Sequence, residues 1–437
     1  MNRRGRRRID YRHSILGLVA GIAFLNGADQ SVMAAVAAPA ARELHIDDTH
    51  LGFLGSAFVI VYALAVIPFG AWADRGIRGR VMGIGVAIWS LATFAGGLAG
   101  SYVQLLLARS LVGIGEASYL PASSSLIGDF YAHAERARAL AWVAAGLRAG
   151  IGVGLIGGAA VAARFGWRAA FFAAGLPGLV LAVLAFRLRE PMRGAAEAVA
   201  PEMAITGEFD WRVYRELLRA PTLLAVIATV ALGLFVTAGV GYWVPFYVQR
   251  HFGVGVGPAG AIAGFPLLVG GLAGTFGGGW LADRRSRSRA SGAFEVTAVA
   301  FGVGSILVAI AFSAGGVPLF VGAYLLAVTC LAVYIPAMMS VAQSIVIPTR
   351  RATAVTLALL AGQLLGTALA PSAIGLVADS LHDLGRSLVL LTTTVSVLAG
   401  AAALTGIRTA AGDMRSMERQ WRALVQSVNA PSRPVAS

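Results

Sequence analysis

Twelve long apolar segments recur along this chain, separated by shorter stretches that hold most of the arginines. A helix needs about 20 apolar residues to cross the hydrocarbon core of a bilayer. Inside that core every backbone polar group must be hydrogen-bonded within the protein, which a helix achieves by itself. We therefore predict an all-α integral membrane protein with twelve transmembrane helices. The predicted spans are 14–38, 50–73, 81–99, 103–130, 138–162, 168–188, 221–249, 258–282, 292–313, 317–346, 352–378 and 386–407.

The composition agrees with a membrane protein and excludes most other classes. Charged residues make up 13% of the chain and the mean hydropathy is +0.75. A soluble domain carries roughly 25% charged residues. The net charge of +14 would suggest nucleic-acid binding in a soluble protein, but here the positive charge lies between apolar segments. We therefore read it as membrane topology and expect no nucleic-acid partner.

The arginines set the orientation of the spans. All 35 basic residues are arginines, and all but seven of them lie on one side of the predicted membrane. The exceptions on the other side are Arg42, Arg164, Arg168, Arg250 and Arg386, and those within spans are Arg109 and Arg148. Cytoplasmic loops carry the excess of positive charge. We expect a multi-pass protein of a bacterial cytoplasmic (inner) membrane with both termini in the cytoplasm.

The longest polar stretch between spans divides the chain into two sets of six. We predict an N-terminal six-helix bundle (1–188), a cytoplasmic linker (189–220), a C-terminal six-helix bundle (221–408) and a cytoplasmic tail (409–437). In the linker Trp211, Tyr214, Leu217 and Leu218 recur at helical spacing beside arginines, which favours a helix lying on the membrane surface. The tail repeats this pattern, with a partner-binding helix as the alternative.

The two halves also share a loop sequence. GAWADRGIRGR begins at Gly70 after the second span, and GWLADRRSRSR begins at Gly279 after the eighth, which is the second span of its own half. Each has a glycine, then an Asp-Arg pair four residues later, then spaced arginines. Internal repeats of this kind are how many secondary transporters are built.

These loops resemble the signature of the major facilitator superfamily, G-x-x-x-D-R-x-G-R-R, although Ile77 and Gly79 depart from it. The resemblance implies two pseudo-symmetric six-helix bundles and a latch that joins them at the cytoplasmic side in the outward-facing state. An Asp facing a helix N-terminus of the other bundle makes a breakable dipole contact. The implied latch residues are Gly70, Asp74, Arg75, Arg78 and Arg80, with Asp283 and Arg284 in the second half.

Other segments resemble the spinster-like branch of that superfamily. LLLARSLVGIGEASYLPASSSLIGDFY is similar to its helix 4, and VGYWVPFYVQRHFG fits its helix 7. The acidic residue of helix 1 is present as Asp29, while Gln30 stands where the branch often has arginine. The resemblance covers nearly the whole chain. It implies a transporter without cofactor, working as a monomer, whose substrate is a lipid-like amphiphile such as a lysophospholipid or a sphingoid compound.

Away from the span ends, four charged residues lie inside predicted spans, where charges are costly and usually functional. Arg109 and Glu116 share one helix face but are about 10 Å apart along the axis, so each needs a partner elsewhere. The depths of Asp29 and Arg109 nearly coincide, which predicts that they pair. For Glu116 the candidate partner is Arg148, a residue that the family pattern does not lead us to expect.

Two roles for these charges remain open at this point. In the first, Asp29 and Glu116 exchange protons as the cavity alternates its exposure, and Arg109 or Arg148 binds an anionic head group. In the second, they form static ion pairs that fix bundle packing. Further polar residues are candidates for lining a substrate cavity: Tyr119, Tyr242, Trp243, Tyr334, Gln343 and Gln363.

Several other function classes lack support in the sequence. GVGLIG and GVGPAG match a dinucleotide-binding pattern, but neither lies in a strand–turn–helix unit, so we read them as sites of close helix packing. The six histidines are scattered and predict no metal site. We expect no enzyme and no cofactor. The hypotheses are a proton-linked carrier of an amphiphile, a carrier of a small organic anion or drug, and, remotely, a non-transporting membrane receptor.

Overall fold

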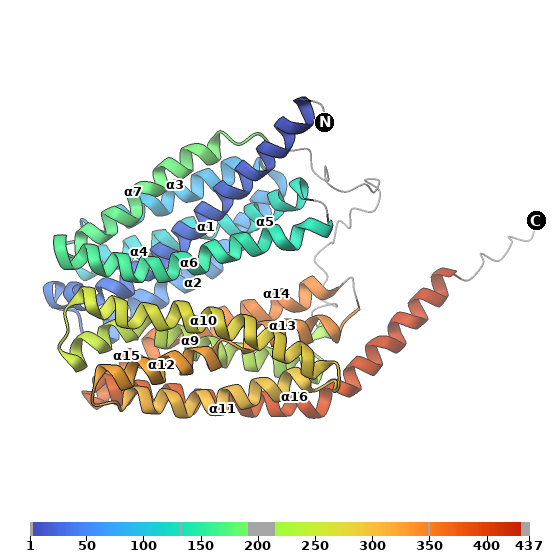
Figure 1. The fold of residues 1–437 in the computed structure, drawn as a ribbon. Helices are drawn as coiled ribbons and strands as arrows, with labels where there is room; N and C mark the ends of the chain where they lie inside the picture. Colours follow the sequence, from blue (N-terminus) through green and yellow to red (C-terminus); the bar gives the residue numbers. More distant parts are fainter. Residues whose placement is uncertain (1–2, 132, 191–214, 348–349, 430–437) are drawn as a thin grey trace, which may run out of the picture.

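The computed structural model describes residues 3–131, 133–190, 215–347 and 350–429, and these fold into two helical bundles (Figure 1). The first bundle contains α1 (Arg3–Leu44), α2 (Asp48–Arg75), α3 (Arg78–Gly96), α4 (Tyr102–Glu116), α5 (Tyr119–Phe130), α6 (His133–Phe165) and α7 (Trp167–Phe186). The second contains α9 (Pro221–Phe252), α10 (Val256–Ser286), α11 (Gly292–Phe312), α12 (Val317–Leu331), α13 (Tyr334–Ser344), α14 (Arg351–Gly362), the π-helical η3 (Gln363–Thr367), α15 (Ala370–Leu381) and α16 (Leu384–Asn429).

The predicted fold class is confirmed, with twelve membrane crossings. Eleven helical segments of the described chain are long and apolar enough to cross a membrane. The twelfth crossing is the predicted span 103–130, which consists of the shorter helices α4 and α5 and carries Arg109 and Glu116. No strand occurs among the described residues. The helix α1 begins and α16 ends at the same end of the molecule, here called the inner end, and the opposite end is called the outer end (Figure 1).

Three spans are interrupted, and each interruption lies one turn before a proline. The break between α4 and α5 precedes Pro121, the break between α12 and α13 precedes Pro336, and η3 ends at Thr367, four residues before Pro371. A proline removes one backbone hydrogen bond and its ring crowds the carbonyl group four residues earlier. The first two breaks lie in the fourth span of each half. The two bundles therefore share a helix break before a proline in the fourth span, in addition to the repeated loop sequence.

Glycines let α1 and α6 approach at backbone distance. A Cβ atom on Gly27 would lie 2.2 Å from the Leu147 carbonyl oxygen, and one on Gly150 would lie 1.9 Å from that of Phe24. Small residues allow this close packing of helices in membranes. The face of α6 that contacts α1 is thereby fixed, and Gly154 of the GVGLIG segment belongs to it through its contact with Ala28.

The two bundles touch each other in the outer half of the molecule. A Cβ atom on Gly260 of α10 would lie 2.2 Å from Ala159 Cβ of α6, and one on Gly264 would lie 2.7 Å from Ile156. On the other side of the interface, a Cβ atom on Gly52 of α2 would lie 2.4 Å from the carbonyl oxygen of Pro371 in α15. The outer ends are therefore held together by close contacts of α6 with α10 and of α2 with α15.

The linker and the tail differ in how much of each the structure describes. Residues 191–214 of the predicted linker, including Trp211 and Tyr214, lie outside the described residues, so the interfacial helix remains a prediction. The tail is helical through Asn429 and continues α16 without interruption. Figure 1 shows this final part of α16, in red, leaving the second bundle instead of packing along it.

Candidate functional site

Asp29 and Arg109 meet in the interior of the first bundle, as their estimated depths predict. Asp29 on α1 is 1% exposed and Arg109 on α4 is 3% exposed. The Arg109 Nη1 atom lies 3.6 Å from Asp29 Oδ2, and Thr93 of α3 donates a hydrogen bond of 2.6 Å from its hydroxyl to Asp29 Oδ1. The Arg109 guanidinium also lies 4.9 Å from the centroid of the Phe58 ring on α2. Four helices therefore surround this ion pair.

Glu116 belongs to the same cluster and does not form a second pair. It is fully buried and accepts a hydrogen bond of 3.0 Å from Gln30 Nε2. Its carboxyl group also interacts electrostatically with both Asp29 and Arg109. The Cα atoms of Arg109 and Glu116 are well separated along α4. Both side chains are long, however, so their charged ends can lie closer together than their Cα atoms. The prediction of two separate pairs is therefore wrong, because three charges share one site.

Arg148 does not contact Glu116. Leu147, Gly150, Ile151 and Gly154 form the face of α6 that packs on α1, whereas Arg148 is exposed beside that face. Among the described residues no ion pair joins Arg148 to a carboxylate. Its electrostatic neighbour is Tyr334 of the second bundle. The pairing was inferred from depth, but depth does not say which way a side chain points around its helix.

The predicted cavity residues divide into buried and accessible ones. Trp243 is fully buried and donates a hydrogen bond of 3.1 Å to the Pro371 carbonyl oxygen, so it packs within the second bundle. Tyr119 is 5% exposed and Tyr334 is 1% exposed. Gln363 is half-buried at the start of η3, and Gln343 is exposed near the inner end. The structure therefore does not gather these six residues around one open space.

Three polar residues at the charged cluster escaped the sequence-based prediction. Asn26 accepts a hydrogen bond of 3.0 Å from Gln30, Thr93 donates to Asp29, and Tyr62 interacts electrostatically with Glu116. A signal for Asn26 was present, because it stands three residues before Asp29 and four before Gln30, and such residues share a helix face. Thr93 and Tyr62 come from other helices, and only the packing brings them near.

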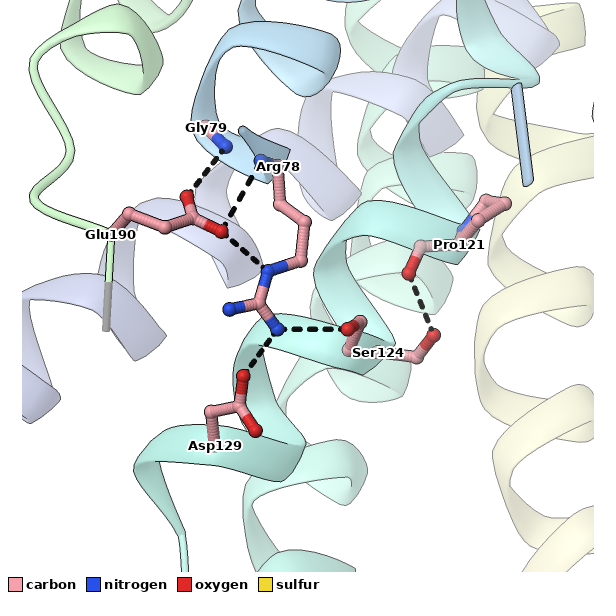
Figure 2. Close-up of polar contacts among 7 residues, drawn as sticks. Arg78, Gly79, Pro121, Ser124, Asp129 and Glu190 are labelled. Atoms are coloured by element: carbon pink, nitrogen blue, oxygen red, sulfur yellow. Dashed lines mark hydrogen bonds and ion pairs between the residues drawn. The ribbon is translucent and has the colours of Figure 1, made fainter. Parts of the chain in front are cut away.

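The most buried of the predicted latch residues binds inside its own bundle (Figure 2). Arg78 is 1% exposed; its Nε atom lies 2.6 Å from Glu190 Oε1, and its Nη1 atom binds Asp129 and donates a hydrogen bond of 2.8 Å to the Ser125 hydroxyl. This residue therefore ties the start of α3 to α5 and to the segment after α7. All three belong to the first bundle.

The remaining latch residues whose side chains the structure describes join no residue of the other bundle by a hydrogen bond or ion pair. Arg75, Arg80, Asp283 and Arg284 are exposed, and a Cβ atom on Gly70 would meet nothing within 4 Å. The side chain of Asp74 lies outside the described residues. Among the described side chains, no hydrogen bond or ion pair joins the two bundles at the inner end, so the latch remains a prediction for another state.

At the outer end, polar contacts do join the bundles. Arg250 Nη1 of α9 lies 2.7 Å from Asp48 Oδ2 of α2. The backbone N–H of Thr49 donates a hydrogen bond of 2.7 Å to Asp379 Oδ2 of α15. Tyr242 donates one of 2.6 Å to the Leu51 carbonyl oxygen. These contacts lie beside the glycine contacts of α2 with α15. Tyr242 therefore helps to join the two bundles at the outer end.

Comparison with known proteins identifies the relatives of this chain. Residues 19–371 match the family described as the Major Facilitator Superfamily. The chain is 28% identical to Protein spinster homolog 1 of Xenopus tropicalis over 86% of this chain and 74% of that protein. It is 29% identical to an MFS-type efflux pump of Mycolicibacterium smegmatis over 88% of this chain and 90% of that protein.

A solved structure shares the fold. The crystal structure of a bacterial homolog to the human lysosomal transporter Spinster, in an inward-facing and unoccupied conformation, superimposes with a TM-score of 0.85. The two sequences are 26% identical, and the match covers 92% of this chain and 98% of that one.

Proposed function

This chain belongs to the major facilitator superfamily, as a spinster-like transporter and not an enzyme, and from that premise we propose a specific activity. It is a proton-coupled carrier that moves a lipid-like amphiphile, a lysophospholipid or sphingoid compound, across a bacterial inner membrane. It works as a monomer by alternating access, and both of its termini face the cytoplasm. The burial of two carboxyl groups, Asp29 and Glu116, near the single guanidinium of Arg109 carries this proposal.

The state of the carrier follows from where the bundles meet. Contacts at the outer end and their absence at the inner end, among the described side chains, support an inward-facing state. The similar bacterial homolog was solved in an inward-facing conformation, which supports the same assignment. The inner end is then the cytoplasmic end, in agreement with the arginine distribution. Alternating access requires the outer contacts to break and the inner ones to form.

The charge count of the cluster supports proton binding. Asp29 and Glu116 share one adjacent cation, Arg109, so the three groups are electrically neutral only when the carboxyl pair holds one proton. In a low-dielectric interior an uncompensated charge is costly, so the cluster favours that protonated state when it is closed off. Contact with water permits the proton to leave. Gln30 donates to Glu116 and keeps one of its oxygens hydrogen-bonded in either state.

The cluster lies wholly within one bundle, which constrains the mechanism. Asp29, Arg109 and Glu116 come from α1 and α4, and Thr93 comes from α3. When the bundles rock as rigid bodies, the distances within this cluster stay the same. What changes is the side from which water reaches it. Proton coupling in this carrier therefore works by a change of access and needs no separation of Arg109 from its acids.

Transport into liposomes tests the proton site. We expect Glu116→Gln to abolish the acceleration of fluorescent lysophosphatidylethanolamine uptake by a pH gradient while exchange without a gradient continues, because one ionisable carboxyl group is gone. Asp29→Asn should act in the same way. Glu418→Gln, at an exposed position of α16, is the matched control and should keep the full response. An undiminished response to the gradient in both Asp29 and Glu116 variants would refute proton coupling through this cluster.

A carrier of a small organic anion or drug is the second candidate function. Two observations favour it: the similarity to an efflux pump of Mycolicibacterium smegmatis, and the exposed Arg148 between the bundles. The same liposome assay distinguishes the two functions. Inhibition of transport by water-soluble organic anions, without inhibition by lysolipids, would support the second function.

A further inference from the structure

Arg148 lies where the two bundles begin to part. One turn further along α6, a Cβ atom on Gly152 would lie 3.1 Å from Leu268 Cδ1 of α10, and Ile156 and Ala159 continue this contact toward the outer end. Residues four apart share a helix face. Arg148 therefore points from the same face as Gly152 toward the second bundle. It is exposed and lies one turn closer to the inner end than the contact of Gly152 with Leu268.

The part of the second bundle nearest to Arg148 carries hydroxyl groups and no charge. The Tyr334 hydroxyl at the start of α13 lies 3.4 Å from the Thr237 hydroxyl of α9. Thr237 donates a hydrogen bond of 3.0 Å to the Gly233 carbonyl oxygen, which leaves its own oxygen free to accept one from Tyr334. Arg148 and Tyr334 interact electrostatically across the interface. Tyr334 is buried, so Arg148 is the accessible charged group at this place in the interface.

Among the residues that the structure describes, none supplies a counter-charge for Arg148 at this depth. In the second half, residues 296–349 and 352–378 contain no charged residue, and residues 221–282 contain only Arg250, which binds Asp48 at the outer end. In the first bundle, Asp29 and Glu116 interact with Arg109. Arg148 lies ten residues after Arg138, where the membrane-spanning part of α6 begins, which is about 15 Å along the helix and too deep for its side chain to reach the inner membrane surface.

We propose that Arg148 is the anchor for an anionic group of the transported molecule, a carboxylate or a phosphate, which is held between the bundles. This inference rests on the proposed transport function and adds a site to it. A guanidinium matches both anions because it presents paired N–H donors.

Such a site also couples binding to closure. When the inner ends approach, water leaves the space around Arg148, and an unpaired guanidinium becomes costly there. A bound anion removes that cost. The empty wild-type carrier should therefore close its inner end rarely, and the loaded carrier should close it readily. Removing the charge of Arg148 should let the empty carrier close as well.

Binding to the purified protein in nanodiscs tests the ligand class. The probes are lysophosphatidic acid, the free fatty acid and the monoacylglycerol of the same chain length, together with inorganic phosphate alone. We expect wild-type protein to bind the two anionic amphiphiles at least tenfold more tightly than the neutral one. Arg148→Gln should abolish this preference and leave monoacylglycerol binding unchanged, and Arg148→Lys should keep part of it. Competition by inorganic phosphate would indicate a free anion as the ligand instead of a lipid head group, which still uses this site.

The matched control lies on the same helix. Arg164 is exposed near the outer end of α6, and Arg164→Gln should keep the preference for anions. Equal preference in Arg148→Gln and wild-type protein would overturn the proposal. Failure of proton coupling is a separate result, because Asp29→Asn and Glu116→Gln leave Arg148 in place and should still prefer anionic probes. Loss of the preference in those variants but not in Arg148→Gln would transfer the anion site to Arg109.

Discussion

The two ends of the interface between the bundles are organised in opposite ways. At the outer end, Asp48 binds Arg250 and Tyr242 binds the backbone of Leu51, so polar contacts cross from one bundle to the other. At the inner end, Arg78 binds Asp129 and Glu190, all within the first bundle. The second bundle does the same, where Arg285 binds Glu295 at 2.9 Å and Arg350 binds Glu216 at 2.5 Å.

Charged contacts therefore have two different structural roles in the molecule. Inner contacts consolidate each bundle as a rigid body, and they need not change when the carrier changes state. Outer contacts hold one state and must break in the cycle. Arg250 is more than half exposed, so water can replace Asp48 around its guanidinium when the outer end opens. Mutations at the two ends should therefore change different measurable quantities.

The largest expected effect is on stability and comes from the inner end. Arg78→Gln removes a guanidinium that is 1% exposed and leaves two carboxylates without their shared partner. Breaking a buried ion pair costs about 3 kcal/mol or more. We expect thermal unfolding of the detergent-purified protein at a clearly lower temperature. Arg78→Lys should not restore it, because one ammonium group cannot replace the planar fork.

The exposed Arg75 provides the control for this change. Arg75→Gln should unfold like wild-type protein. If Arg78→Gln unfolds at the wild-type temperature, the inner contacts do not consolidate the first bundle, and the comparison between the two ends fails.

The second-largest expected effect is on the equilibrium between the inward-facing and outward-facing states, and the substitution lies at the outer end. A methyl group at Gly52 would lie 2.4 Å from the Pro371 carbonyl oxygen and 2.9 Å from Ser372 Cα, and backbone atoms cannot move aside as a side chain can. Overpacking of this kind costs about 1–3 kcal/mol. We expect Gly52→Ala to disfavour the inward-facing state and shorten the distance between spin labels at Arg187 and Arg287, two exposed positions at the inner ends. The labels require Cys330→Ser to remove the native cysteine.

The control for Gly52→Ala lies on the same helix. Gly70→Ala meets open space in this state and should not shorten the distance between the labels. An unchanged distance distribution in Gly52→Ala would show that the contact of α2 with α15 does not determine the state.

The smallest effect concerns one hydrogen bond at the outer end. Tyr242→Phe removes the bond of 2.6 Å to Leu51, and one such bond contributes about 1 kcal/mol, or roughly a fivefold shift in population. The same pair of spin labels measures it. Tyr324→Phe is the matched control, because the buried Tyr324 hydroxyl has no hydrogen-bond partner among the described atoms. Equal shifts in both variants would assign the effect to the loss of a hydroxyl in general.

The sequence predicts the parts of this molecule that depend on length, depth and sign of charge. Apolar length gives the spans, and matched depths place Asp29 beside Arg109. The direction of a side chain around its helix depends on how neighbouring helices pack, so the pairing of Glu116 with Arg148 was wrong. The breaks before Pro121 and Pro336 were readable in principle, because a proline inside a long apolar run disrupts the turn before it.

The uneven placement of charge has an evolutionary consequence. The first bundle holds the whole ionisable cluster, whereas residues 296–349 and 352–378 of the second bundle carry no charge at all. Substitutions of residues in the second bundle can therefore accumulate without disturbing the groups proposed to bind the proton. Gene duplication followed by divergence of that half alone would generate carriers for new cargoes that inherit one unaltered energy-coupling unit.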